Sequence, residues 1–215
     1  MIKKFMSVSL LAAVIFSGAI YQSAHAAEAN DNLVYVPVAD ITPQESFSTT
    51  EGKTYDELYE EYDLKSFDLS TLPEGTEVIK VDSEEELEAL LQYLDSEESV
   101  QVVDDSNKIS LFAAGVIKKE TTKKAGLATI HLEGKTYVES SGSFRYIDNA
   151  VARTWADGVT FALDWTEIYA DADIAKNKTS VNFDAKGNLK YVMVVQGVGT
   201  FFDRNVDLSL FYSLY

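Results

Sequence analysis

The chain has 215 residues, and 35 acidic against 18 basic residues give it a net charge of −17. An acidic surface repels phosphate backbones and anionic lipid head groups, so we expect no nucleic acid partner. Hydrophobic residues make up 46% of the chain, which excludes wholesale disorder, and the absence of cysteine excludes disulfides and thiol nucleophiles.

The first 26 residues have the composition of a secretory signal peptide. Lys3 and Lys4 precede an apolar run at residues 8–20, and Ala24-His25-Ala26 forms a small-x-small cleavage box. The apolar run is shorter than a membrane-spanning helix requires. We therefore expect a signal peptide over residues 1–26, a secreted bacterial protein with an extracellular location, and no membrane anchor after cleavage.

The remaining chain is divided by charge. Residues 27–105 carry 23 acidic and 3 basic side chains, whereas residues 106–215 carry 12 and 13. Such asymmetry indicates two regions under different constraints. At the start of the acidic region, residues 27–52 are polar apart from one short apolar run at 33–38. We expect a flexible leader there, with one edge strand.

Residues 53–105 are predicted to form an acidic α/β segment. Thr54 begins a capping box that opens a short helix. Further on, a strand at 78–81, a helix after Ser83 and a second strand at 100–103 have the size of a small βαβ unit. The longer helix has an apolar stripe at helical spacing, made of Leu87, Leu90, Leu91 and Leu94.

Residues 106–126 are predicted to be a linker between the acidic segment and a β-rich region. They hold the only basic cluster outside the signal peptide, formed by Lys118, Lys119, Lys123 and Lys124. Such a cluster is typical of an exposed connector. It also suits a processing or docking site, because it separates a very acidic region from a neutral one.

Residues 127–215 alternate polar and apolar side chains with the period of two that predicts β-strands. Turn signals indicate hairpins around 133–135 and 184–188 and at Asp157-Gly158. The alternation breaks at Thr166-Glu167, where we expect a bulge. Short strands without a convincing helix favour an antiparallel β-sandwich or barrel. The predicted fold class is therefore α+β, a small acidic α/β segment followed by an antiparallel β domain.

His131 is the only histidine outside the predicted signal peptide. It lies in an alternating strand, where a histidine on the sheet surface is the usual outcome. A Ser-His-Asp system would have to use this residue, and the G-x-S-x-G motif is absent. Common zinc sites need two or more His or Cys ligands, so no zinc enzyme is expected.

Carboxylates are the remaining catalytic candidates. Asp164 and Glu167 flank Trp165, which would place an acid pair beside an aromatic platform, as in enzymes that hydrolyse sugars. The alternative is a solvated strand end beside a core tryptophan, and both Trp155 and Trp165 suit a core role.

Calcium is the one metal to consider. Asp203, Asn205 and Asp207 supply the first three oxygen positions of a calcium loop. The chain lacks the glycine at the sixth position and the glutamate at the twelfth, where Leu208 and Leu214 stand. The three residues are therefore weak calcium candidates, and no cofactor is predicted.

Three functions from different classes fit these observations. The first is a secreted, non-enzymatic protein whose β-sandwich binds an extracellular partner, either a protein or a cell-surface glycan. The second is a secreted precursor in which an acidic pro-region precedes a β-rich effector, such as an antimicrobial one. The third is an extracellular hydrolase that uses carboxylates. Because no catalytic signature is present, the first is the primary expectation.

Overall fold

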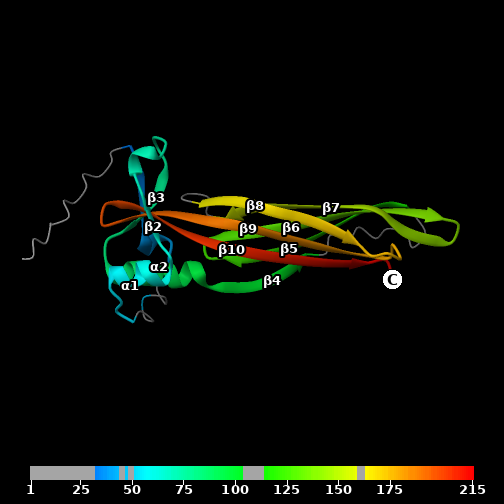
Figure 1. The fold of residues 1–215 in the computed structure, drawn as a ribbon, viewed down its shortest axis with the longest axis horizontal. Helices are drawn as coiled ribbons and strands as arrows, with labels where there is room; N and C mark the ends of the chain where they lie inside the picture. Colours follow the sequence, from blue (N-terminus) through cyan, green and yellow to red (C-terminus); the bar gives the residue numbers. More distant parts are fainter. Residues whose placement is uncertain (1–31, 44–46, 48–50, 104–113, 159–162) are drawn as a thin grey trace, which may run out of the picture.

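The computed structural model describes residues 32–43, 47, 51–103, 114–158 and 163–215. Within them the fold is mostly β with two sheets, so the predicted β-rich class is confirmed in this coarse form. Figure 1 shows an elongated molecule with the helices gathered at one end and long strands running to the other. The predicted signal peptide lies outside the described residues.

The first sheet, called sheet A, contains segments from both halves of the chain. Its six strands are β1 (Val34–Pro37), β2 (Lys65–Phe67), β3 (Glu77–Val81), β8 (Leu163–Ile174), β9 (Ser180–Val195) and β10 (Val198–Ser213). Strands β9 and β10 form an antiparallel hairpin over their whole lengths. The other edge of β9 pairs with β8 and, near its end, with β3. Strand β10 pairs with β2 at its start, and β1 joins β3 as the predicted edge strand.

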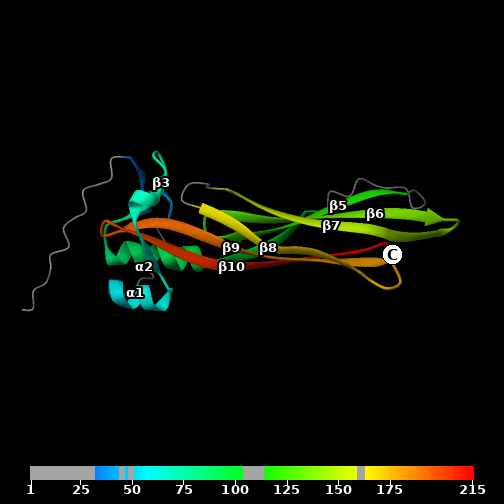
Figure 2. The same cartoon turned by 45° about the horizontal axis from the view of Figure 1, so that its top comes forward.

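The second sheet, called sheet B, is antiparallel, and its strands are neighbours in sequence order. They are β4 (Glu97–Val103), β5 (Gly115–Ala125), β6 (Ala128–Ser141) and β7 (Phe144–Gly158). Figure 2 shows β5, β6 and β7 layered against β8, β9 and β10 along the long part of the molecule. One hydrophobic core lies between the two layers and extends under the helices.

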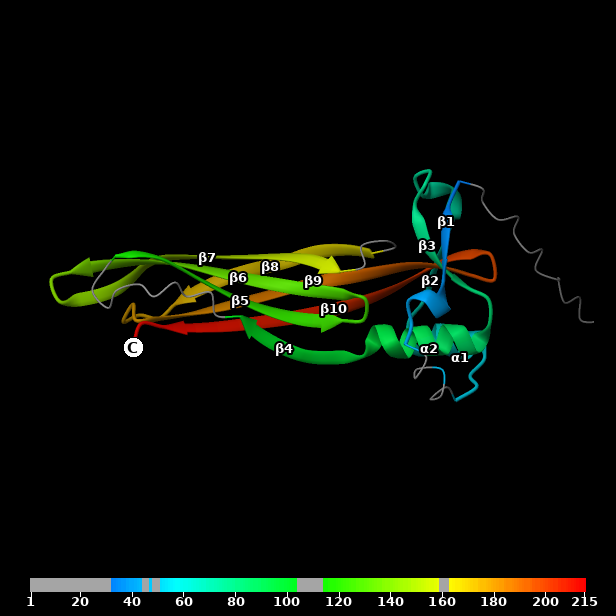
Figure 3. The same ribbon diagram turned by 180° about the vertical axis from the view of Figure 1, so that it is seen from behind.

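Two α-helices and two short 3₁₀ turns complete the elements described. They are α1 (Tyr55–Glu61), α2 (Glu84–Asp95), η1 (Val38–Asp40) and η3 (Leu69–Thr71). Thr54 caps α1 through the predicted capping box, and the Ser83 hydroxyl caps α2. The leucine stripe of α2 is fully buried, as predicted. From behind, α2 leads directly into β4 (Figure 3).

Two glycines in mid-strand let aromatic rings fill the space between the sheets. The Phe183 ring lies over Gly134, and the Trp165 ring lies over Gly187. A Cβ atom at these glycines would come within 2.6 and 2.2 Å of the respective ring atoms. Glycine inside a strand commonly marks such a close approach. The two hairpins predicted around these glycines are therefore wrong, since β6 and β9 run straight through both positions.

The predicted βαβ unit is also wrong. Strands β3 and β4 flank α2 in sequence but belong to different sheets. Both edges of β3 are occupied, because it pairs in parallel with β1 on one side and with β9 on the other. Strand β4 pairs with β5 instead. The lysine cluster likewise lies in strand β5 and not in a linker, while residues 106–113 of the predicted linker lie outside the described residues.

Several local predictions are confirmed. The register of β8 against β9 shifts between Glu167 and Tyr169, at the predicted bulge. Strand β10 alternates buried and exposed residues through Leu210, as predicted.

The hairpin predicted at Asp157-Gly158 is wrong, because β7 ends there and the next described strand, β8, belongs to the other sheet.

A buried arginine connects α2 to sheet A. Arg204 of β10 donates through Nη1 to the carbonyl oxygens of Leu94 (2.6 Å) and Ser96 (3.0 Å) at the end of α2. These carbonyls have no partner within the helix, and a cation at this end also complements the helix dipole. Beside it, the Tyr191 hydroxyl donates to the Ala125 carbonyl of sheet B at 2.5 Å. The helix and both sheets therefore meet at one point.

We predict that Arg204→Met lowers the free energy of unfolding by about 2 kcal/mol, because two buried carbonyls lose a charged donor. Chemical denaturation followed by circular dichroism measures this change. The exposed neighbour Asn205→Ala is the matched control and should stay within about 0.5 kcal/mol of the wild type. Equal stability of the two variants would contradict the role given to Arg204.

Candidate functional site

The outward side of sheet B carries an ordered array of polar, charged and aromatic side chains, which we call the sheet-B face. On β6, Ile130, Leu132 and Val138 point into the core, as do Gly134 and Thr136, so the alternate residues Thr129, His131, Glu133, Lys135 and Tyr137 point outward. The register with β5 and β7 arranges the outward residues in five rows. From the far tip toward the helices these are Val116–Tyr137–Asn149, Lys118–Lys135–Val151, Glu120–Glu133–Arg153, Thr122–His131–Trp155 and Lys124–Thr129–Asp157.

His131 is the centre of this face. Its Nδ1 lies 2.6 Å from Glu120 Oε1 on β5, and its Nε2 lies 2.8 Å from Asp157 Oδ2 on β7. The imidazole ring stacks on Trp155 with ring centroids 4.7 Å apart and an angle of 9° between the planes. Only 13% of the side chain is exposed. The prediction that His131 lies on a sheet surface is therefore confirmed, and three strands meet at its ring.

The two carboxylates determine the charge of His131. Burial of the ring, the largest single effect, lowers the pKa of His131. The hydrogen bonds and charges of Glu120 and Asp157 together outweigh it and raise the pKa above its ordinary value. A Ser-His-Asp system requires a hydroxyl at one histidine nitrogen, where the ring can deprotonate it. His131 has a carboxylate beside each nitrogen instead.

A second ion network lies one row away. Glu133 is buried on the sheet-B face, with Arg153 Nε at 2.8 Å and Lys135 Nζ at 3.3 Å from its Oε1. Burial, the largest single effect, raises the pKa of Glu133, but Lys135 and Arg153 together outweigh it and lower the pKa below its ordinary value. Arg153 also lies over the Trp155 ring, 5.1 Å from its centroid. The two networks therefore share Trp155.

The part of the face nearer the tip carries three exposed apolar side chains. Val116, Tyr137 and Val151 occupy two adjacent rows and are 47%, 38% and 47% exposed. Side chains directly opposite or diagonal on neighbouring strands lie within contact distance of one another. Lys118 and Lys135 share a row with Val151. An exposed apolar patch thus adjoins a charged one on the same side of the sheet.

The carboxylates proposed for a hydrolase lie elsewhere and on opposite faces. Glu167 accepts hydrogen bonds from the Thr154 amide (3.1 Å) and hydroxyl (2.5 Å), and Trp165 Nε1 donates to the same hydroxyl (3.2 Å). Glu167 and Trp165 therefore share a side of β8. Asp164 precedes Trp165 and points to the other side, where Lys190 is its register partner. Trp165 is part of the core packing, and this arrangement forms no acid pair.

The calcium candidates lie on one side of an extended strand, not in a loop. Asp203 and Asp207 of β10 are four residues apart, about 13 Å along a strand, so they cannot converge on one cation with Asn205. Each aspartate has a lysine nearby, Lys65 at 3.9 Å and Lys186 at 3.6 Å. Across the described part of the chain, no group of three or more His, Cys, Asp or Glu side chains could hold a metal ion.

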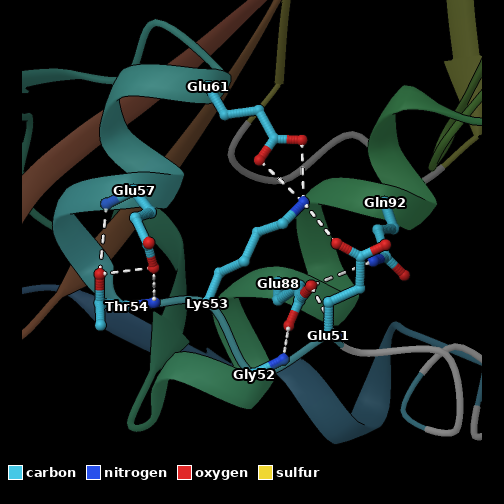
Figure 4. A network of polar contacts seen from close by, with 8 residues as sticks. All are labelled: Glu51, Gly52, Lys53, Thr54, Glu57, Glu61, Glu88 and Gln92. Atoms are coloured by element: carbon cyan, nitrogen blue, oxygen red, sulfur yellow. Dashed lines mark hydrogen bonds and ion pairs between the residues drawn. The ribbon is translucent and has the colours of Figure 1, made fainter.

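A buried carboxylate at the helical end has a structural role (Figure 4). Glu88 of α2 is fully buried and accepts hydrogen bonds from the backbone amides of Glu51 (2.8 Å) and Gly52 (3.0 Å). Lys53 lies between Glu61 (2.9 Å) and Glu51 (3.2 Å), and the hydrogen bonds to these carboxylates raise the pKa of Lys53. These contacts hold the segment before α1 against α2.

Sequence reasoning identified His131 as a surface residue but missed its partners. Outward positions on each strand follow from the alternation, so Glu120, Trp155 and Asp157 could have been placed on a surface. Their meeting depends on the register of β5 and β7 against β6, which alternation does not determine.

Comparisons with protein-family models, with curated proteins and with solved structures gave no match for this chain. Among the described residues, neither helix is long and apolar enough to cross a membrane.

We predict that Glu133→Gln lowers the free energy of unfolding at neutral pH by about 1 kcal/mol, because Arg153 and Lys135 lose their charged partner. A lowered pKa in the folded state adds stability above the ordinary glutamate pKa of about 4.3 and loses it as the pH falls through the folded value. The variant should therefore lose less stability between about pH 5 and pH 3. Urea titrations across this range measure it, with the exposed Glu139→Gln as control. If Glu133→Gln loses as much stability as the wild type between about pH 5 and pH 3, the ion-pair role given to Glu133 is refuted.

Proposed function

We propose that this chain is a secreted, non-enzymatic binding protein whose recognition surface is the sheet-B face. The observation that carries the proposal is the continuity of the face. An exposed apolar patch of Val116, Tyr137 and Val151 adjoins charged side chains that are already held in place by ion pairs. A surface that is ordered before binding loses little side-chain entropy when a partner docks.

The outward side of sheet A offers no comparable patch. The large exposed apolar residues in its strands are Val34 on β1, Val198 at the start of β10, and Ile168, Tyr169 and Phe211 farther along the sheet. Tyr169 is the register partner of Lys186, whereas Phe211 is the partner of Asn182, two rows further along. These side chains are therefore separated by polar rows, while those of the sheet-B face occupy adjacent rows.

The chemistry of the sheet-B face favours a protein partner. Protein interfaces have an apolar centre with a polar, charged rim, and the patch has this composition, with Lys118 and Lys135 beside it. A sugar platform needs an uncovered aromatic ring, whereas Trp155 is stacked on His131 and covered by Arg153. A cell-surface glycan is the alternative partner, and binding to a glycan array distinguishes it from a protein.

The structure also bears on the precursor alternative. Release of a β-rich effector at the lysine cluster requires a protease to bind an extended, unpaired chain. Strand β5 pairs with β6 along its whole length, and the stretch around Lys123 and Lys124 also adjoins β4. Cleavage there would require sheet B to open first, which supports an intact chain as the functional form.

We predict that the triple variant Val116→Ser, Tyr137→Ser, Val151→Ser binds its partner at least tenfold more weakly, because it removes the apolar centre of the face. Fluorescently labelled protein is applied to the surface of the cells that export it and to a glycan array. Exposed positions are changed, so the circular dichroism spectrum should stay that of the wild type.

The matched control replaces exposed apolar residues of sheet A, Ile168→Ser with Phe211→Ser, and should bind as the wild type does. Equal binding by the triple variant, or equal loss in both variants, would overturn the assignment of the face. If the protein binds the glycan array, and if protease treatment of the cells does not reduce its binding to them, the partner is a glycan and not a protein.

Limited proteolysis tests whether the chain stays intact. We predict that trypsin leaves the bonds after Lys118, Lys119, Lys123 and Lys124 uncut in the native protein and cuts them in denaturant. The exposed turn at Lys176 and Lys178 is the internal comparison and should be cut first. Mass spectrometry of the fragments over time shows the order in which these bonds are cut. Cleavage in β5 before that turn would favour the precursor alternative.

A further inference from the structure

The charge of the His131 ring matches its surroundings in only one protonation state. A cationic imidazole carries an N–H group at both nitrogens, and a carboxylate lies beside each: Glu120 is hydrogen-bonded to Nδ1 at 2.6 Å, and Asp157 lies 2.8 Å from Nε2 at ion-pair distance, without hydrogen-bond geometry. A neutral imidazole has one N–H donor and one lone pair. One of the two carboxylates would then face that lone pair without a donor, which is unfavourable, and Asp157, with 58% of its side chain exposed, can turn to water more readily than Glu120, with 30% exposed.

The two cations of the neighbouring rows whose contacts are described pair with a different carboxylate. Arg153 of β7 and Lys135 of β6 contact Glu133, two residues further along β6. Lys124 of β5 is the register partner of Thr129. On β4, the register partner of Thr122 is the uncharged Gln101, and Glu98 is opposite Lys124. The described side-chain contacts of His131 thus reach β5 through Glu120 and β7 through Asp157 and Trp155, in addition to the backbone pairing of the three strands.

We infer that the sheet-B face is controlled by a proton on His131: the protonated ring clamps the Glu120 and Asp157 side chains in place, and loss of the proton releases one of these two carboxylates. This inference rests on the proposed use of the face for recognition. Trp155 stacks on the same ring, so a change in the charge of His131 also acts on the indole, over which Arg153 lies.

The direction of the effect follows from the charge of the ring. Because the neighbouring carboxylates raise the pKa of His131 in the folded protein, the clamp contributes fully below the ordinary histidine pKa of about 6.5. Its contribution is lost as the pH rises through the raised folded value. The face is therefore ordered below the raised pKa of His131 and loosens as the pH rises through it, and recognition should weaken in the same direction.

The first test needs no binding partner. Histidine-labelled full-length protein is titrated by NMR, and the His131 signal is identified by its loss in His131→Gln. We expect a pKa above the ordinary value that falls when either partner is replaced, in Glu120→Gln or Asp157→Asn. Glu139→Gln, an exposed acid on β6, is the control and should leave the His131 pKa unchanged. A wild-type pKa at or below the ordinary value would overturn the inference.

The second test reads the face itself. A protonated imidazole quenches a stacked indole, so tryptophan emission should rise as the pH increases through the His131 pKa. The rise should be absent in His131→Gln and in Trp155→Phe. If His131→Gln fails to fold, Glu120→Gln serves in its place and should move the midpoint to lower pH. An emission that does not follow the His131 titration would refute the coupling to the face.

Binding measured at about pH 6 and about pH 9 separates this inference from the proposed function. Wild-type binding that weakens at the higher pH, with pH-independent binding by His131→Gln, supports both. If nothing binds the face while the NMR and fluorescence results hold, the clamp stands and the recognition role fails. Binding with equal strength at both pH values overturns control by the proton and leaves the recognition role intact.

Discussion

The pairing of the long β9–β10 hairpin with strands from the acidic half of the chain is the constraint on which the rest depends. Strand β9 accepts β8 and β3 along one edge, and β10 accepts β2, so sheet A is complete only when residues far apart in sequence come together. Arg204 extends this connection to α2, and Tyr191 extends it to sheet B. The acidic segment is thus built into the sheet on which the β-rich half folds.

This arrangement explains why the outward faces can carry function. The core between the sheets is filled from the inside, where rings over Gly134 and Gly187 take up the space that side chains would otherwise fill. Outward positions do not fill this core, and on sheet B a row with two lysines lies next to a row with two glutamates. Like charges lie opposite one another, as Lys118 does to Lys135 and Glu120 to Glu133. Diagonal and same-strand pairs of opposite charge offset this repulsion.

Local features of this fold could be predicted from the sequence, and long-range ones could not. The cap at Thr54, the leucine stripe of α2 and the bulge near Glu167 depend on a few neighbouring residues, and all are confirmed. The glycines at 134 and 187 were misread as turns, because a ring from another strand is what makes glycine necessary there. The partners of β3 and of His131 depend on sheet order and register, which alternation leaves open.

Native-state hydrogen exchange tests the central claim most directly, namely that both halves of the chain form one cooperative unit. Amides of β3 that pair with β9 should be protected and should exchange through the same opening as β9 and β10, with the free energy of global unfolding. Rapid exchange of residues 77–81 while β9 and β10 stay protected would contradict the account. The sheet-B face would then belong to a β-rich part that folds without the acidic segment.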